Sequence, residues 1–162
     1  MVGRVWPRHG YRGRPLNSVV RRHCVETDLE LTQLPVVERI IRASWSHETA
    51  WDPSSWSPEI PESGQCWSTA YVIRAIFGGE IVHAEVLPSK VPKEHHAWNR
   101  LPDATTVDLT RAQFGPAQQF RECTLPESLI MSVAGVQAQC LLGRVEAGLR
   151  VTMTPNNSLE RT

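Results

Sequence analysis

Two stretches in the first half of the chain repeat apolar residues at helical spacing. The first stripe consists of Val36, Val37, Ile40 and Ile41. It follows Pro35, which suits the first position of a helix, so residues 35–44 are predicted to form a short amphipathic helix. The second stripe consists of Ala70, Ile73 and Phe77, with Tyr71 beside it. It predicts a helix that begins at Cys66 and ends at Gly78 and Gly79, which favour a left-handed cap.

Three shorter runs that mix apolar and polar residues follow, at residues 81–87, 95–101 and 105–109. Pro102, Asp103 and Ala104 separate the last two runs, a spacing typical of a β-hairpin. After a bend at Gly115 and Pro116 and a polar segment, residues 136–149 predict a final helix. Helices that precede a run of strands indicate an α+β fold. We therefore expect N-terminal helices packed on a three-stranded or larger antiparallel sheet, and a C-terminal helix.

The chain has 162 residues, 41% of them hydrophobic, which is enough for one domain with an apolar core, predicted at residues 33–150. Its 17 basic and 17 acidic side chains balance, but residues 1–25 contain six Arg and no Asp or Glu. We predict that residues 1–32 are a disordered basic extension and residues 151–162 a disordered polar tail. A nucleic-acid arm or a transit segment would also be rich in Arg. Because the extension has no apolar period, repeat or series of aromatic residues, nucleic acid is not an expected partner.

No run of apolar residues is long enough for a membrane span, and none follows the basic extension, so the expected localisation is cytoplasmic, without membrane partners. The four cysteines lie at positions 24, 66, 123 and 140, a wide spacing that indicates neither a disulfide framework nor a zinc ribbon. A metal site drawn from Cys66, His83, His95 and His96 lacks the close spacing of structural zinc sites. No metal or other cofactor is expected, and the oligomeric state stays open.

The chemistry of the sequence is concentrated around Cys66. A long irregular connection at residues 46–65 precedes it, and connections of this length are often functional. A thiol in the first turn of a helix faces unpaired backbone N–H groups and the positive end of the helix dipole, and both favour the thiolate. Cys66 is therefore a candidate nucleophile. Gln65 and the backbone N–H of Cys66 are candidate donors to an oxyanion.

His96 and Asp108 are the candidate base and its orienting group. A three-residue turn at 102–104 would place Leu101 opposite Thr105, which makes His96 and Asp108 diagonal neighbours on one face of the sheet. A turn of two or four residues would place them on opposite faces. Asn99 points away from His96 on the same strand and is the weaker alternative. With the three-residue turn, we expect one ring nitrogen within about 4 Å of the Cys66 sulfur and the other near the Asp108 carboxylate.

Three motifs carry a resemblance to a known family: SGQCWSTAYVIRAIFGGEI, HAWNRL and VDLTRAQF. In order and spacing they resemble the YunG family of bacterial proteins, over residues 34–150. The matching positions are Gly64, Gln65, Cys66, His96, Trp98, Asn99, Asp108, Thr110, Gln113 and Phe114. The resemblance implies a papain-like or transglutaminase-like core, with the cysteine opening a helix and the histidine and aspartate on following strands. Ala97, where the family has an aromatic residue, and the additional His95 depart from the pattern.

Two hypotheses of function follow. The first is a thiol-dependent hydrolase or acyltransferase that acts on an amide or ester, such as a peptide or a small amide, with Cys66, His96, Asp108 and Gln65 as its site. The second is a non-catalytic binding module that uses a groove lined by Trp45, Trp51, Trp56 and Trp67, residues that otherwise cover a small core. A cysteine paired with a base should react with iodoacetamide below the reference pKa of about 8.5, which separates the two.

Overall fold

The computed structural model describes residues 29–88, 94–124 and 127–153. The α-helices are α2 (Leu34–Ser44), α3 (Cys66–Phe77) and α4 (Glu127–Met153). The strands are β1 (Glu80–Leu87), β2 (His95–Arg100), β3 (Thr106–Val107) and β4 (Gln119–Glu122). Short 3-10 helices lie at η1 (Leu31–Gln33), η2 (Pro53–Ser55) and η3 (Arg111–Gln113). The α+β class predicted from the sequence is confirmed.

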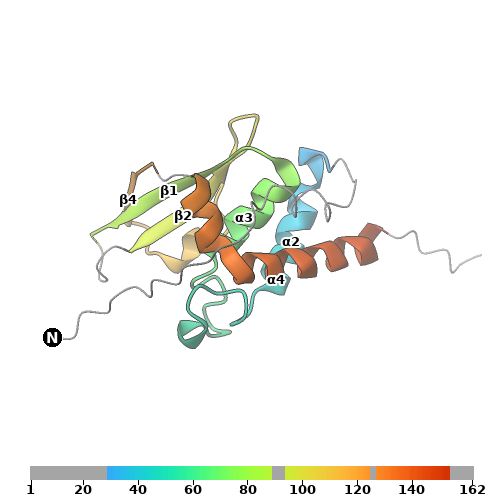
Figure 1. Ribbon diagram of the computed structural model, residues 1–162, viewed down its shortest axis with the longest axis horizontal. Coiled ribbons are helices and arrows are strands. Elements are labelled where there is room, and N and C mark those ends of the chain that lie inside the picture. The colour runs from blue at the N-terminus through green and yellow to red at the C-terminus, as the bar shows by residue number, and fades with distance from the viewer. Residues whose placement is uncertain (1–28, 89–93, 125–126, 154–162) are drawn as a thin grey trace, which may run out of the picture.

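The strands form one antiparallel sheet in the order β3-β2-β1-β4 (Figure 1). The sequence did not predict β4, because Phe120 is its only apolar residue and no alternation marks it. Pairing of Phe120 with Val86 holds this edge strand in place. Strand β3 is shorter than the predicted 105–109, so it does not pair with residues 96–98 of β2.

The hairpin between β2 and β3 has the predicted register. Asn99 pairs with Val107, and the Leu101 N–H donates to the Thr105 carbonyl at 2.8 Å. Side chains alternate between the two faces of a strand, so Asn99 and Val107 share one face, and residues 96 and 108 share the other. The predicted placement of His96 and Asp108 on one face is confirmed.

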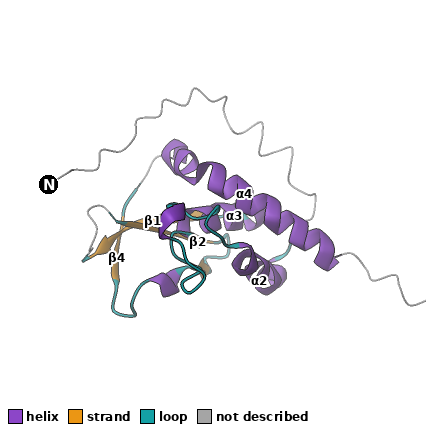
Figure 2. Ribbon diagram, turned by 90° about the horizontal axis from the view of Figure 1, so that it is seen from below, coloured by secondary structure: helices purple, strands orange, loops and turns teal. Residues whose placement is uncertain are grey.

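Helix α3 packs against β1 and β2 of the sheet and also against α4, while α2 packs against α4 (Figure 2). The main core lies among these elements and includes Ile41, Ile73 and Leu141, which are almost completely buried. A Cβ on Gly79, which has a φ of +79°, would lie 2.3 Å from the Arg100 carbonyl oxygen. Glycine is therefore required where α3 turns into β1.

Gly135 divides α4 into two helical segments, because its backbone is not helical (φ 39°, ψ −141°). The second segment agrees with the helix predicted at 136–149 and continues to Met153, past the predicted start of the polar tail at residue 151. Within the described residues, no helix is long and apolar enough to cross a membrane.

The predicted boundary of the basic extension, residue 32, lies inside the folded domain. Leu29 packs against the core, and η1 begins at Leu31. Residues 1–28 and 154–162 lie outside the described part of the chain, as does Cys24.

Deleting residues 1–28 should leave the melting temperature unchanged, whereas deleting residues 1–30 should lower it. The second deletion removes Leu29, and loss of a partly buried leucine costs about 1 kcal/mol, or about 2–4 °C in a chain of this size. Thermal unfolding of the full chain and both deletions measures the difference. A fall of several degrees on removal of residues 1–28 alone would show that the basic stretch contributes to folding.

Candidate functional site

Hydrogen bonds to the preceding connection fix the start of α3. The Ser68 hydroxyl donates to the Thr49 carbonyl at 2.8 Å, and the Trp45 indole N–H donates to the Thr69 hydroxyl at 3.0 Å. The N-cap residue Gln65 makes no side-chain cap, which leaves the first backbone N–H groups of the helix without a side-chain acceptor. Cys66 is thus held at the predicted position, the first residue of α3.

His96 and Asp108 are in direct contact, as predicted. His96 Nε2 lies 2.8 Å from Asp108 Oδ2, with His96 fully buried and the Asp108 side chain 17% exposed. The Thr110 N–H donates to the other carboxylate oxygen, Oδ1, at 3.2 Å. Gln113 Nε2 donates to the Thr110 carbonyl at 3.0 Å, and Gln113 Oε1 accepts from the Gly64 N–H at 3.4 Å. A chain of hydrogen bonds therefore runs from the residues before Cys66 to the carboxylate that holds His96.

Aromatic rings surround the imidazole of His96. The centroids of Phe114, Phe120 and Trp98 lie 4.8, 5.1 and 5.4 Å from that of His96. These rings exclude water from the histidine, and in such surroundings its hydrogen bond to Asp108 is electrostatically stronger than in water.

The Cys66 thiol lies beside the residue that follows His96. Cys66 belongs to a small buried cluster with Trp67, Ala70, Ile81 and Ala97, and the backbone N–H of Ala97 lies near enough to lower the pKa of the thiol. His96 Nδ1 is buried and has no hydrogen-bond partner in the described part of the chain. The predicted contact between this nitrogen and the sulfur is therefore not a hydrogen bond here. Because successive residues of a strand point to opposite faces, Cys66 and the His96 ring approach β2 from different sides.

Burial outweighs the helix N-terminus in setting the charge of Cys66. Loss of hydration raises the pKa of the Cys66 thiol to about 11, and the negative charge of Asp108 raises it further, although the backbone N–H groups of Ala97 and Trp67 lower it. The sequence-based expectation of a favoured thiolate is wrong for this state, since Cys66 is only 5% exposed. The resting thiol is protonated at neutral pH.

The other predicted site residues divide between structural roles and the surface. Gln65 is fully buried, and its Nε2 donates to the Ser46 carbonyl at 2.9 Å, so its role as an oxyanion donor stays a prediction. Trp45 and Trp67 are buried, whereas Trp51 is 45% exposed. Asn99 donates to the Ala70 carbonyl at 2.9 Å and thus points away from His96, as expected.

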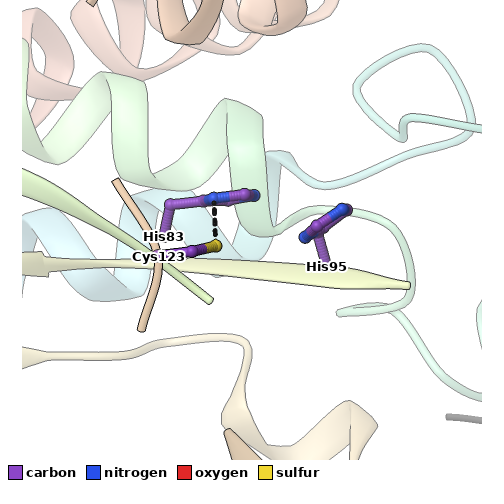
Figure 3. A group of neighbouring side chains, drawn as sticks. All are labelled: His83, His95 and Cys123. Carbon is purple, nitrogen blue, oxygen red and sulfur yellow. Dashed lines mark hydrogen bonds between the residues drawn. The ribbon is translucent and has the colours of Figure 1, made fainter. Parts of the chain in front are cut away.

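A second group of chemically active side chains lies on the α3 face of the sheet: His83, His95 and Cys123 (Figure 3). The sequence singled out both histidines but not Cys123, because the register of the unpredicted strand β4 brings this cysteine to them. Burial lowers the pKa of His83 to about 4, helped by the neighbouring His95, so its ring is neutral at pH 7. Neutral imidazole and thiolate sulfur are ligands of zinc and other transition metals.

Comparison with known proteins gives a consistent assignment. The family model described as "YunG protein" matches residues 33–145. The chain is 35% identical over 78 residues to a protein of Bacillus subtilis (strain 168) described as "Uncharacterized protein YunG". This match covers 48% of the chain and 60% of the relative's length. No solved structure matches the chain. The match over residues 33–145 includes Cys66, His96 and Asp108, and the chain belongs to the YunG family.

Proposed function

We propose that the protein is a thiol-dependent acyltransferase or hydrolase with Cys66 as nucleophile, His96 as base and Asp108 as the group that orients the base. The observation that carries the proposal is the state of the His96 ring. Asp108 holds Nε2 at 2.8 Å, while Nδ1 is buried without a partner beside the strand residue that contacts Cys66. A base held by one nitrogen, with the other free to accept a proton, is the arrangement that nucleophilic catalysis requires.

The reaction would transfer the acyl group twice, first to Cys66 and then to water or another nucleophile. The Cys66 sulfur attacks the carbonyl carbon of an amide or ester while its proton passes to His96 Nδ1. The backbone N–H groups of Cys66 and Trp67, with Gln65 as a further candidate, would stabilise the oxyanion. His96 then returns the proton to the leaving amine or alcohol, and a thioester to Cys66 remains. Water or another nucleophile, deprotonated by His96, attacks the thioester and releases the sulfur as the thiol.

The raised pKa of Cys66 favours general-base catalysis by His96 over attack by a preformed thiolate. A thiol with a pKa of about 11 loses its proton during the attack rather than before it, so His96 acts as a general base. The sulfur must then close onto Nδ1 when a substrate binds, and catalytic hydrogen bonds are often formed only in the substrate complex. Strand β3 does not pair with residues 96–98 of β2, so no ladder hydrogen bond of β3 has to break for that approach.

The proposed substrate is a peptide or a small amide or ester. Trp51 supports this class, because its side chain is 45% exposed and its backbone N–H donates to the carbonyl of Gly64, two residues before Cys66. An exposed indole at this position offers an apolar surface to a substrate. We also propose that the domain has a papain-like core and that the protein is located in the cytoplasm.

A non-catalytic binding module is the competing function, and one observation favours it. Cys66 is 5% exposed and protonated at rest, as a structural cysteine would be. In that case the His96–Asp108 pair stabilises the fold, and the exposed Trp51 contacts a partner.

Formation of an acyl-enzyme tests the proposal. Incubation with a panel of aryl esters and thioesters should add one acyl mass to the protein, located at Cys66 by peptide mass spectrometry. The adduct should be absent from Cys66→Ala and retained in Cys123→Ser and Cys140→Ser, which control for the other described thiols. Acylation spread evenly over the four cysteines of the chain, or none at Cys66, would favour the binding module.

A further inference from the structure

The backbone brings His83 of β1, His95 of β2 and Cys123, which follows β4, to one face of the sheet. Cys123, directly after β4, donates its backbone N–H to the His83 carbonyl of β1 at 2.8 Å, so the two residues are cross-strand partners. In the register of β1 with β2, His83 pairs with Ala97 and Glu85 pairs with His95. His83 and His95 are therefore diagonal neighbours on the face that contacts α3.

The three side chains converge without forming a closed hydrogen-bond network. His83 Nδ1 lies 3.1 Å from Cys123 Sγ, and the rings of His83 and His95 stack at 4.6 Å with an angle of 28° (Figure 3). One ligand atom from each residue lies within 4.8 Å of the others. His83 Nε2 and His95 Nδ1 are buried without hydrogen-bond partners in the described residues. Buried polar atoms without partners are costly, and a bound ion would satisfy those that serve as its ligands.

We propose that His83, His95 and Cys123 bind a zinc ion, with the fourth coordination position open to water or another small ligand. Imidazole nitrogen and thiolate sulfur are both zinc ligands, and zinc sites with three protein ligands keep one position open. Zn–N and Zn–S bonds of about 2.0–2.1 and 2.3 Å place tetrahedral ligand atoms roughly 3.3–3.6 Å apart. A separation of up to 4.8 Å must therefore close by about 1.2–1.5 Å at most, through rotation of the half-buried His95 at the start of β2.

The charges around the group suit a divalent cation. Binding releases the Cys123 proton to solvent, so the ion and the thiolate together carry one positive charge. Glu85, the cross-strand partner of His95, lies near enough to His83 and Cys123 to affect the pKa of both. Its carboxylate also forms an exposed ion pair with Arg121.

The zinc site is separate from the proposed catalytic residues but adjacent to them in the chain. His95 and His96 are consecutive residues of β2 and point to opposite faces of the sheet. Trp67, which follows Cys66, packs its ring 4.9 Å from that of His83. A bound ion would cross-link β1, β2 and the end of β4 on the α3 face of the sheet. This role does not depend on whether Cys66 is catalytic.

Metal titration of the full-length protein tests the inference. After removal of bound metal with a chelator and reduction of the thiols, calorimetry with zinc chloride should give one site and the release of one proton per ion. Cobalt(II) should give the absorption of a tetrahedral site with a sulfur-to-cobalt charge-transfer band. His83→Ala, His95→Ala and Cys123→Ser should each weaken binding by more than the roughly 10- to 100-fold typical of outer-sphere changes.

Matched substitutions separate this site from other cysteines and histidines. Cys140→Ser, Cys66→Ser and His47→Ala should leave the affinity and the cobalt spectrum unchanged. Because His95 is only half-buried, His95→Asn tests the site if the other variants do not fold. Unchanged zinc binding in folded variants of all three proposed ligands, or the lack of a sulfur-to-cobalt band in the unsubstituted protein, would overturn the inference. Neither outcome depends on acyl transfer at Cys66.

Discussion

Replacing His96 with glutamine should slow alkylation of Cys66 by iodoacetamide about 100- to 10,000-fold near neutral pH, the usual contribution of a general base. Above a pH of about 11, where the thiol ionises without help, the two proteins should react at similar rates. Peptide mass spectrometry measures the rate at Cys66 separately from those at Cys123 and Cys140.

The form of the two pH profiles follows from where the thiol proton goes. In the unsubstituted protein the proton moves from Cys66 to His96 Nδ1 and stays within the molecule, so the rate should be independent of pH over the neutral range. In His96→Gln the proton must leave to solvent. Because burial raises the pKa of the thiol to about 11, the thiolate fraction and the rate should then rise about tenfold per pH unit up to that value.

The exposed His47 provides the control, since His47→Gln should keep the pH-independent region. His96 is completely buried, so the variant's thermal unfolding must be measured alongside its reactivity. If the unsubstituted protein itself reacts only above a pH of about 8.5, with the profile of His96→Gln, the imidazole does not accept the proton and the binding-module hypothesis is favoured.

The sequence predicted the parts of the site that depend on local spacing. Apolar periodicity and the glycine pair define α3 and therefore the position of Cys66 at its start. The length of the turn at 102–104 defines the register of β2 with β3, and with it the contact between His96 and Asp108. Both inferences concern residues that are close in the chain, where few conformations are compatible with the pattern.

Features that depend on distant segments were not predictable in the same way. The ionisation of Cys66 depends on how completely the surrounding cluster, with Ile81 and Ala97 from the sheet, removes it from water. The approach of Cys66 and His96 from different sides of β2 depends on the packing of α3 against the sheet. Cys123 reaches His83 only through β4, an edge strand with too few apolar residues to be recognised.

The Asp108→Asn variant should lose the pH-independent reactivity of Cys66 while it remains folded, with a reduction of about 100- to 10,000-fold near neutral pH. The Thr110 N–H donates to Asp108 Oδ1, and only an oxygen can accept that bond. An asparagine would therefore place its oxygen toward Thr110 and its NH₂ group toward His96 Nε2. That group donates, so Nε2 becomes the acceptor and the ring proton moves to Nδ1, which can then no longer take the thiol proton.

Asp108 acts here as a positioning residue, and its test needs a measurement that a purely structural role would not change. In Asp108→Asn, nitrogen NMR of the His96 ring should show the proton on Nδ1 instead of Nε2. Above a pH of about 11, Cys66 should be alkylated at the rate of the unsubstituted protein. Asp103→Asn is the matched control, because Asp103 accepts hydrogen bonds from Thr105 in the exposed turn and does not contact His96. A variant that loses several degrees of thermal stability but keeps the neutral reactivity of Cys66 would instead make Asp108 a structural partner of His96, since removal of a buried pair's acceptor destabilises the fold.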